Sequence, residues 1–424
     1  MSGSAGGLRP KGQVLIENWI DNLHHGGHNS LVIARVLESR LRGMARKFPV
    51  VTVTGPRQSG KTTLCRAVFP DKPYVSLEAP DVQEFARQDP RGFLAERRDG
   101  AVLDEVHRVP DLLSYIQTMV DDRPTRGRFI LTGSANFALL QSLGQSLAGR
   151  TALLELLPLG LEEVRRFPAP PEGLLEVLWR GSYPAVYDRG LDPGEWYPSY
   201  VATYLERDVR SILNVGNLVA FQTFVRLCAG RVAQLVNLSS MGADAGVTHG
   251  TVKSWLSVLD AGYVAWRLPP FHANVSKRLI KTPKLHFLDS GLVCYLLGIR
   301  SANQLGEHPL RGAIFETWVA SEILKSRVHR GLTPSLSFFR DRKGAEVDVV
   351  VELGRSFLAV EAKSAQTVAS DFFGGLQAFE SLVASSRLRC DVRCFVVYGG
   401  GESQRRSAGT VVPWSGIDRC EWWE

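Results

Sequence analysis

The sequence predicts an α/β protein with a mostly parallel sheet, then a helical middle region and a second, smaller α/β region. Three observations predict this class. Between residues 48 and 157, short apolar runs alternate with helix-like segments, as in parallel sheets with helices on both faces. A glycine-rich turn joins the first apolar run to a helix-like run. Alternating strands that carry acidic side chains follow residue 336.

The length and composition are ordinary for a soluble globular protein. The 424 residues leave room for two or three domains, and 44% of them are hydrophobic and 22% charged. We expect no transmembrane helix, because no window approaches 18 uninterrupted apolar residues, and the chain start lacks a signal-peptide core. The net charge of +7 is dispersed, so it permits nucleic-acid binding without requiring it. We therefore expect a cytoplasmic protein.

The six cysteines contain no C-x-x-C pair, so we expect buried reduced thiols rather than disulfides or a metal site. The histidines at residues 24–28 have no acidic or cysteine neighbour and predict a polar loop. The cysteines are Cys65, Cys228, Cys294, Cys390, Cys394 and Cys420.

The amino-terminal region is expected to form a flexible leader over residues 1–30 and a nucleotide-binding core over residues 31–157. The apolar runs predict strands at 49–54, 73–77, 100–104, 128–133 and 151–157. Helical spacing predicts helices at 31–47, 61–69, 81–88, 110–121 and 135–148.

The turn after the first strand has the pattern G-x-x-x-x-G-K-T, which is typical of a phosphate-binding loop when a strand precedes it and a helix follows. Its glycines let successive backbone N–H groups point inward at phosphate oxygens, and the next helix adds its positive end. The lysine is expected to reach the β- and γ-phosphates, and the first threonine to bind Mg²⁺. The cradle residues are Gly55, Pro56, Arg57, Gln58, Ser59, Gly60, Lys61, Thr62 and Thr63.

Two acidic residues stand at the end of the strand at 100–104 and directly after it. Behind a phosphate loop, this pattern predicts that Asp104 lies near Mg²⁺ and that Glu105 orients the attacking water. The alternative is a solvated strand end. After the next strand, we select Ser134, with Asn136 second, for contact with the γ-phosphate or the water, although a helix N-cap is equally compatible.

An arginine follows the predicted helix at 135–148. Arg150 stands just before the next strand, where a cation can reach a nucleotide held by a neighbouring subunit. The alternative is a surface arginine at a helix end.

These motifs resemble the AAA+ superfamily of ATPases, and within it the prokaryotic ATP-binding proteins that carry an AAA_14-like ATPase domain and a carboxyl-terminal DUF4143 region. The resemblance rests on residues 53–63, 103–110, 132–134 and 148–150, and it covers nearly the whole chain. It implies a P-loop NTPase fold, ATP rather than GTP, and a match between Arg150 and the trans-acting arginine of the superfamily. The sensor arginine of the lid is not placed, with Arg180 as one candidate.

Residues 158–204 are expected to form a helical lid with helices near 174–179 and 196–204. Its aromatic side chains are interpreted as core packing, with a base-stacking surface as the alternative. They are Trp179, Tyr183, Tyr187, Trp196, Tyr197, Tyr200 and Tyr204.

Residues 205–300 predict a helical and winged-helix-like domain. A short helix, a turn at Gly246 and a helix N-capped by Thr248 fit a helix-turn-helix, and a strand at 262–268 fits a wing. The second helix is expected to expose His249, Thr251, Lys253 and Ser254 and to bury Val252, Trp255 and Leu259. Residues 239–284, with a basic run at 277–284, are candidates for binding double-stranded DNA; a protein-contact module is the alternative.

Residues 301–424 carry a second set of acidic residues. Asp348 lies on one predicted strand, and Glu361 and Lys363 share one face of the next. Carboxylates suit Mg²⁺, and a lysine can position a water. The order resembles the PD-(D/E)xK nucleases and so implies a restriction-endonuclease-like domain with Glu316 as accessory acid, Asp348 and Glu361 as metal ligands, and a contribution from Gln377. An inactive or regulatory domain is the alternative. Residues 399–409 are expected to be a flexible loop.

Three functional hypotheses are compatible with these motifs. The first is an ATPase whose nucleotide cycle rearranges the carboxyl-terminal modules on DNA, with a homo-oligomer required if Arg150 acts in trans. The second adds ATP-gated, Mg²⁺-dependent DNA cleavage by the last domain. The third is a slow nucleotide-dependent signalling switch whose carboxyl-terminal modules bind protein partners.

Overall fold

The computed structural model describes residues 32–133, 146–205, 218–271, 282–386 and 390–423. Residues 33–424 form one compact unit. Ser134 and Asn136 lie outside the described residues, as do Lys277, Arg278 and Lys281 of the basic run.

The amino-terminal sheet has five parallel strands in the order β2-β3-β4-β1-β5. All five predicted strands are confirmed, with ends that differ by one or two residues. The central strand β1 is buried along its whole length, as expected where helices cover both faces. The strands are β1 (Val50–Thr54), β2 (Tyr74–Ser76), β3 (Ala101–Asp104), β4 (Phe129–Thr132) and β5 (Thr151–Glu155).

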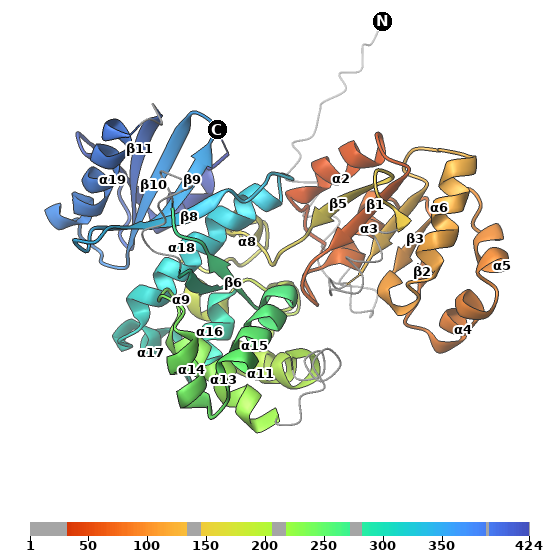
Figure 1. Cartoon of the computed structure of the whole chain (residues 1–424), viewed down its shortest axis with the longest axis horizontal. Helices are drawn as coiled ribbons and strands as arrows, with labels where there is room; N and C mark the ends of the chain where they lie inside the picture. The colour runs from red at the N-terminus through yellow and green to blue at the C-terminus, as the bar shows by residue number, and fades with distance from the viewer. Residues whose placement is uncertain (1–31, 134–145, 206–217, 272–281, 387–389, 424) are drawn as a thin grey trace, which may run out of the picture. The chain divides into compact units, whose positions relative to one another are not determined.

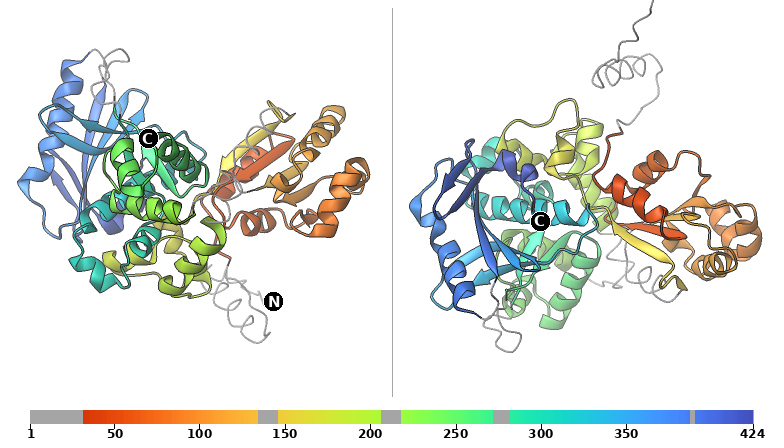
Figure 2. Two further views of the ribbon diagram at one scale, coloured as in Figure 1. Left: turned by 60° about the horizontal axis from the view of Figure 1, so that its bottom comes forward. Right: turned by 90° about the horizontal axis from the view of Figure 1, so that it is seen from above.

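Helices cover the two faces of this sheet (Figures 1 and 2). Helices α2 and α3 pack on the face that carries Val51 and Val53. Helices α4, α5 and α6 pack on the face that carries Val50 and Leu103. This alternation follows from the period of two along each strand. The helices are α2 (Leu37–Ala45), α3 (Lys61–Val68), α4 (Pro80–Gln88), α5 (Pro90–Ala95) and α6 (Leu112–Asp122).

The segment after β5 is helical, as predicted for the lid. Its aromatic side chains form part of a hydrophobic core: Tyr183, Trp196, Tyr197 and Tyr200 are almost fully buried. The interpretation as packing is therefore confirmed for these four residues, and the base-stacking alternative is wrong for them. The elements are α8 (Leu161–Val164), α9 (Leu174–Arg180), α10 (Pro184–Asp188), α11 (Pro193–Tyr200) and the short π-helix η2 (Val201–Leu205).

The middle region contains the predicted helix, turn and helix. Gly246 ends α14 with a φ of 67°, and the Thr248 hydroxyl caps α15 by accepting from the Thr251 N–H. The inner face of α15 is buried at Val252, Trp255 and Leu259, and its other face is exposed or half-exposed, as predicted. The antiparallel hairpin of β6 and β7 follows. The elements are α13 (Leu218–Gly230), α14 (Leu238–Ala245), α15 (His249–Ala261), β6 (Ala265–Leu268) and β7 (Lys284–Phe287).

The carboxyl-terminal region is a mixed sheet in the order β12-β13-β11-β10-β9-β8. Strands β8, β9 and β10 are antiparallel, whereas β10, β11 and β13 run parallel. The helices are α16 (Ser290–Leu296), α17 (Ala302–Glu307), α18 (Arg311–Val328) and α19 (Gly374–Ser385), with short turns η1 (Val106–Arg108), η3 (Ser370–Phe373) and η4 (Trp414–Arg419). The strands are β8 (Leu336–Arg340), β9 (Glu346–Leu353), β10 (Ser356–Lys363), β11 (Asp391–Tyr398), β12 (Gln404–Arg406) and β13 (Gly409–Pro413).

The prediction of a flexible loop over residues 399–409 is wrong in part. Residues 404–406 pair as an antiparallel edge strand with β13. The glycines around this segment disfavour a strand, so the composition did not indicate the short strand that pairs with β13.

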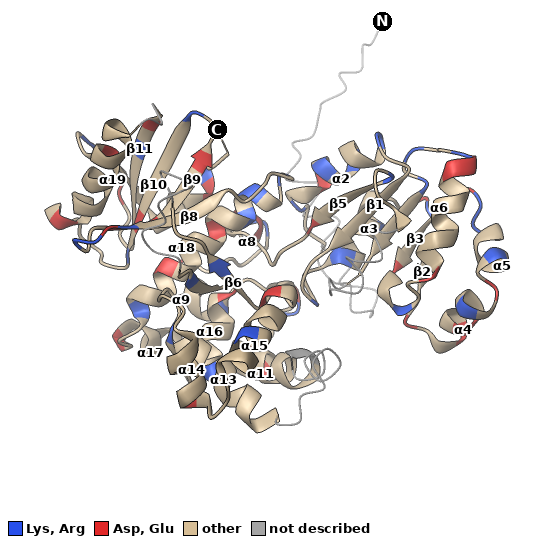
Figure 3. Ribbon diagram, in the orientation of Figure 1, with Lys and Arg blue, Asp and Glu red and all other residues tan. Residues whose placement is uncertain are grey.

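The remaining predictions at the level of the whole chain concern cysteines, charge and membrane spans. The six cysteines, all of which the structure describes, are thiols outside any disulfide; Cys65, Cys228 and Cys294 are buried, and the other three are half-buried. Basic and acidic residues are spread over many elements of the ribbon (Figure 3). Within the described residues, no helix combines the length and the apolar character needed to cross a bilayer.

Candidate active site

The phosphate-binding pattern forms a tight turn between β1 and α3. Gly55 has a φ of 144°, and a Cβ there would lie 2.2 Å from the Leu156 carbonyl oxygen. Gly60 has a φ of 92° directly before α3 begins at Lys61. Both positions therefore need glycine, one for close approach to a neighbouring backbone and both for a backbone conformation that side chains disfavour. The turn has the shape of a cradle for phosphates at a helix N-terminus.

The Lys61 ammonium is buried and lies across this turn. Its Nζ donates to the carbonyl oxygens of Gly55 (3.2 Å) and Pro56 (2.7 Å). Burial lowers the pKa of Lys61 to about 8, although the carboxylates of Glu105 and Asp104 favour the charged form. The ammonium is thus held at the loop, and an anion that binds there would raise the pKa of Lys61 and favour its charged form.

Asp104, at the end of β3, faces the first residues of α3. The Thr62 hydroxyl lies 3.0 Å from both Asp104 carboxylate oxygens. The Tyr74 hydroxyl donates to Oδ2 at 2.8 Å, and the Thr132 hydroxyl donates to Oδ1. A hydroxyl beside a carboxylate is a ligand set that suits Mg²⁺, so these residues fit the ion that the loop pattern implies.

Glu105 adopts a left-handed backbone conformation, with a φ of 56°. Its Oε2 lies 2.9 Å from His107 Nδ1. Burial by itself raises the pKa of Glu105, but the His107 hydrogen bond and the Lys61 charge outweigh it and lower the pKa to about 2. Glu105 is therefore a carboxylate throughout the physiological range, able to accept a hydrogen bond from a water.

Three residues of this site were not predicted from the sequence as site residues: Tyr74, Thr132 and His107. Thr132 ends β4, which lies between β3 and β1, so the rule that parallel strand ends share one edge is a signal for it. His107 follows Glu105 by two residues, but only the turn η1 brings the two side chains together. Tyr74 is on β2, at the edge of the sheet, and carries no local signal.

The two predicted arginines lie elsewhere on the surface. Arg150 pairs with Asp121 through Nε (2.5 Å) and Nη2 (2.9 Å) and is about one third exposed. Arg180 pairs with Glu176 one turn earlier in α9, at 2.7 Å. Arg150 as a trans-acting residue and Arg180 as a sensor stay predictions.

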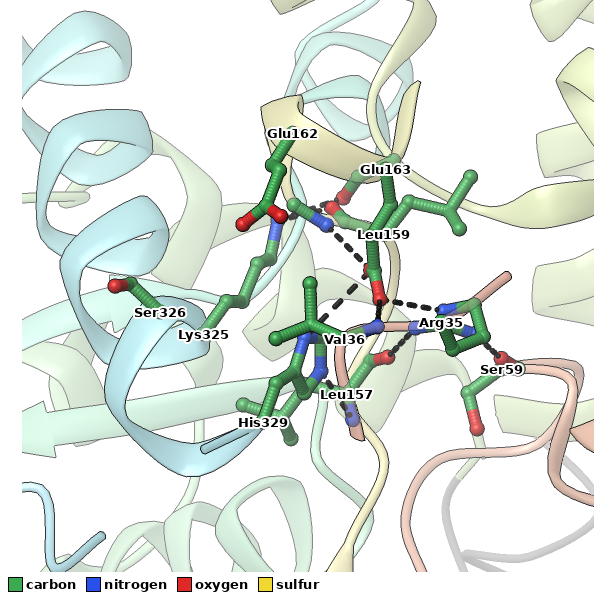
Figure 4. A network of polar contacts seen from close by, with 12 residues as sticks. Arg35, Val36, Ser59, Leu157, Leu159, Glu162, Glu163, Lys325, Ser326 and His329 are labelled. Carbon is green, nitrogen blue, oxygen red and sulfur yellow. Dashed lines mark hydrogen bonds and ion pairs between the residues drawn. The ribbon is translucent and has the colours of Figure 1, made fainter. Parts of the chain in front are cut away.

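Arg35, just before α2, binds the phosphate loop from outside (Figure 4). Its Nη1 donates to the Ser59 carbonyl (2.7 Å) and its Nη2 to the Leu157 carbonyl (2.9 Å). Its Nε lies 2.9 Å from Glu163, which is fully buried. Burial raises the pKa of Glu163, but the positive charge of Arg35 outweighs this effect and lowers the pKa to about 2. A pair of opposite charges thus supports the loop throughout the physiological range.

Helix α18 joins the same network (Figure 4). His329, at its end, lies 3.6 Å from Glu163 and accepts from the Leu157 N–H through Nε2 at 3.1 Å. Burial lowers the pKa of His329 to about 4, so the ring is neutral at neutral pH. Lys325 donates to the Leu159 carbonyl at 3.1 Å and to the Ser182 hydroxyl at 2.9 Å. A continuous chain of contacts therefore connects Ser59 with α18.

The acidic residues of the carboxyl-terminal region gather around a lysine from β7. Lys284 Nζ lies 2.7 Å from Glu316 and 3.3 Å from Asp348, and it also pairs with Glu346. The lysine is only 3% exposed. Its expected contact with DNA phosphate is therefore wrong, because its charge is buried among carboxylates.

The other two predicted residues of this cluster pair with one another. Lys363 Nζ lies 2.6 Å from Glu361, as their shared face predicts. Burial and the nearby Asp348 charge raise the pKa of Glu361 to about 8. Gln377 is exposed on α19. In the part of the chain that the structure describes, no group of three or more His, Cys, Asp or Glu side chains is arranged to hold a metal ion. Mg²⁺ binding by Asp348 and Glu361 stays a prediction; in this structure the Lys284 ammonium pairs with Asp348, and the Lys363 ammonium pairs with Glu361.

Comparison with known families agrees with the sheet order and the loop. Residues 47–165 match a family described as an AAA domain. Residues 171–303 match the domain of unknown function DUF8612, and residues 311–417 match the domain of unknown function DUF4143.

Similar proteins occur in mycobacteria. The uncharacterized proteins Rv2008c of Mycobacterium tuberculosis and Mb2031c of Mycobacterium bovis are each 32% identical over 345 residues, which is 80% of this chain and 75% of theirs. Among solved structures, a Walker-type ATPase of Pyrococcus abyssi is 16% identical, with a TM-score of 0.45 over 61% of this chain and 94% of that one. RuvB of Thermotoga maritima is also 16% identical, with a TM-score of 0.30 over 55% and 89%. The chain belongs to the family of these mycobacterial proteins and is a prokaryotic AAA+-type ATP-binding protein with an AAA domain and a DUF4143 domain.

Proposed function

We propose that this protein hydrolyses ATP with Mg²⁺ at residues 55–63 together with Asp104 and Glu105. The observation that carries the proposal is the contact of the Thr62 hydroxyl with both oxygens of Asp104, beside a buried Lys61. A hydroxyl, a carboxylate and an ammonium beside a phosphate loop are the groups that bind a nucleoside triphosphate and its Mg²⁺, and this chemistry supports the proposal.

Each residue has a distinct task in this proposal. The loop N–H groups and Lys61 bind the phosphates, and Thr62 and Asp104 would hold Mg²⁺. When bound, the ion supplies positive charge that stabilises the transferring phosphoryl group. Glu105 accepts a hydrogen bond from the attacking water and orients it. Ser134 is proposed to contact the γ-phosphate, and Arg150 to serve a neighbouring subunit's site in a homo-oligomer.

The first test is the ATP turnover of three proteins: wild type, Lys61→Ala and Glu105→Gln. Lys61→Ala should lose nucleotide affinity, and Glu105→Gln should bind ATP but turn it over slowly. Undiminished turnover by Lys61→Ala would reject the site. Particle mass, measured in each nucleotide state, tests whether the homo-oligomer needed by Arg150 exists.

We further propose that the nucleotide cycle changes how the carboxyl-terminal modules engage double-stranded DNA in the cytoplasm. The chain of contacts from Ser59 to α18 supplies a physical connection for such coupling. The exposed face of α15, which includes His249, Lys253 and Ser254, supports a winged-helix-like contact with DNA. DNA affinity that falls steeply with salt, and that differs between nucleotide states, is the expected result.

A nucleotide-dependent switch that binds protein partners is the second candidate. The observation that favours it over DNA cleavage is that the Lys284 ammonium pairs with Asp348, one of the two metal ligands that the nuclease resemblance implies, and with the accessory acid Glu316. DNA binding that is absent at low salt would favour the protein-binding switch. Cleavage of any DNA form by the wild-type protein with Mg²⁺ or Mn²⁺, lost in Lys363→Ala while ATP turnover persists, would restore the nuclease hypothesis.

A further inference from the structure

The carboxylate cluster of the carboxyl-terminal sheet is built around one buried cation from another region of the chain. Lys284 belongs to β7 of the middle region, whereas Glu316 is on α18 and Asp348 is on β9. We propose that the Lys284 ammonium is a built-in cation that closes this cluster to divalent metals and fastens the β6–β7 hairpin to the carboxyl-terminal sheet.

The negative charges of the cluster require a compensating cation. Three carboxylates, from Glu316, Glu346 and Asp348, pair with the ammonium of Lys284. Asp348 is 6% exposed and accepts one further hydrogen bond, from the Ala362 N–H at 2.9 Å. A carboxylate buried as deeply as that of Asp348 is strongly destabilising unless a positive charge compensates it. The ammonium supplies that charge without any bound ion.

The ammonium and a metal ion compete for the same place. Nζ lies 2.7 Å from Glu316 Oε1 and 3.3 Å from Asp348 Oδ1, so it fills the space beside Asp348 that a metal ion bound to this carboxylate and to Glu316 would take. A Mg²⁺ ion binds oxygens at about 2.0–2.1 Å and carries two positive charges, so it cannot share this space with an ammonium. Glu361 leaves its Oε2 buried without a hydrogen-bond partner in the described residues, and it is 8% exposed. That oxygen is an additional ligand for a metal once Lys284 is gone.

The source of Lys284 gives the cluster a role in the architecture. Strand β7 pairs with β6, which follows the helix α15 directly. The ion pairs of Lys284 therefore join β7 to Glu316 of α18 and to Glu346 and Asp348 of β9, and their loss would leave these carboxylates without that cation. The cluster therefore acts as a lock between the two regions. This inference does not depend on ATP hydrolysis.

Mn²⁺ binding tests the proposal, measured by electron paramagnetic resonance on nucleotide-free full-length protein. All variants carry Asp104→Asn, so that the phosphate-loop carboxylate does not contribute a site. Adding Lys284→Met should create about one new Mn²⁺ site per chain, and adding Asp348→Asn to that protein should abolish it. Lys343→Met, at an exposed lysine in the turn before β9, is the matched control and should create none.

Two outcomes would overturn the proposal. One is Mn²⁺ binding by the Asp104→Asn protein that disappears on adding Asp348→Asn, because it would show that Lys284 leaves the cluster open. The other is a folded Lys284→Met protein that gains no site. If Lys284→Met does not fold, Lys284→Gln replaces it. The comparison of Asp104→Asn with Asp104→Asn plus Asp348→Asn still tests the proposal, because both of these proteins keep Lys284.

Discussion

The Thr62 hydroxyl lies 3.0 Å from each oxygen of the Asp104 carboxylate. This contact joins the first turn of α3 to the end of β3, two strands away from β1 in the sheet. It places an oxygen pair of the kind Mg²⁺ prefers beside the phosphate loop. Tyr74 and Thr132 add donors that fix the orientation of the carboxylate.

Asp104→Asn should reduce Mg²⁺-dependent ATP turnover by about 100-fold or more, the range observed when one preorganised polar group is removed. The amide is a weaker metal ligand than the carboxylate and carries no charge. Steady-state phosphate release over a Mg²⁺ titration measures the effect. Asp111→Asn, at the exposed residue before α6, is the control and should leave turnover unchanged. Similar turnover in the two variants would contradict the role of Asp104.

Glu105→Gln should separate binding from hydrolysis. The glutamine keeps the shape of the side chain but loses the charge that orients water, so turnover should fall by about 100-fold or more while ATP affinity stays within about threefold. Equilibrium binding of a fluorescent ATP analogue and phosphate release measure the two quantities separately. A variant that loses affinity and turnover in parallel would instead indicate that Glu105 supports the loop.

The carboxylates and the loop were predictable because their motif is local. The spacing between Gly55 and Thr62 sets the backbone of one turn, and a parallel sheet brings the end of β3 beside it. The supporting contacts were not predictable in this way. Arg35 reaches Glu163 across 128 positions of sequence, and Lys284 reaches Asp348 across 64. Such pairs depend on tertiary packing, and no periodic pattern or fixed spacing in the sequence indicates them.

The same limit explains the error at Lys284. A lysine at the end of a basic run indicates phosphate contact when only the neighbouring residues are considered. In the fold, β7 pairs with β6 and places that side chain inside, where carboxylates from α18 and β9 surround it. The prediction of which face of α15 is buried was correct because helical periodicity depends on local geometry alone.

The lowered pKa of Lys61 predicts a proton uptake on ATP binding. Burial lowers this pKa to about 8, so the amine of the free protein is largely neutral at about pH 9, and the nearby phosphates raise its pKa on binding. About one proton should therefore be taken up at about pH 9 and almost none at about pH 7, and ATP affinity should fall as the pH rises above 8. Calorimetry in two buffers of different ionisation enthalpy measures the uptake.

Lys61→Arg is the control for this measurement, because a guanidinium stays protonated over the whole range. Its ATP binding, even if weaker, should show equal proton uptake at the two pH values. Wild-type binding with the same proton uptake at both pH values would contradict a lowered pKa at Lys61.

Glu163→Gln should destabilise the protein because it leaves the Arg35 charge buried without its partner. The pKa of Glu163 falls from 4.5 to about 2 on folding, which corresponds to roughly 3 kcal/mol in the free energy of unfolding at neutral pH. Because the folded-state pKa is lowered, this stabilisation is complete above about pH 4.5 and is lost as the pH falls towards 2. Urea denaturation should show a difference between wild type and variant that shrinks over this window.

Glu38→Gln provides the matched comparison, since Glu38 also pairs with an arginine, Arg42, at 3.0 Å, but on the surface of α2. An exposed pair one helical turn apart contributes about 0.5 kcal/mol or less, so this variant should stay close to wild type. Because Arg35 also binds the Ser59 carbonyl, Glu163→Gln should in addition weaken ATP binding, whereas Glu38→Gln should not. Equal losses of stability in the two variants would contradict the larger contribution of the buried pair, and unchanged ATP binding by Glu163→Gln would show that the pair does not support the phosphate loop.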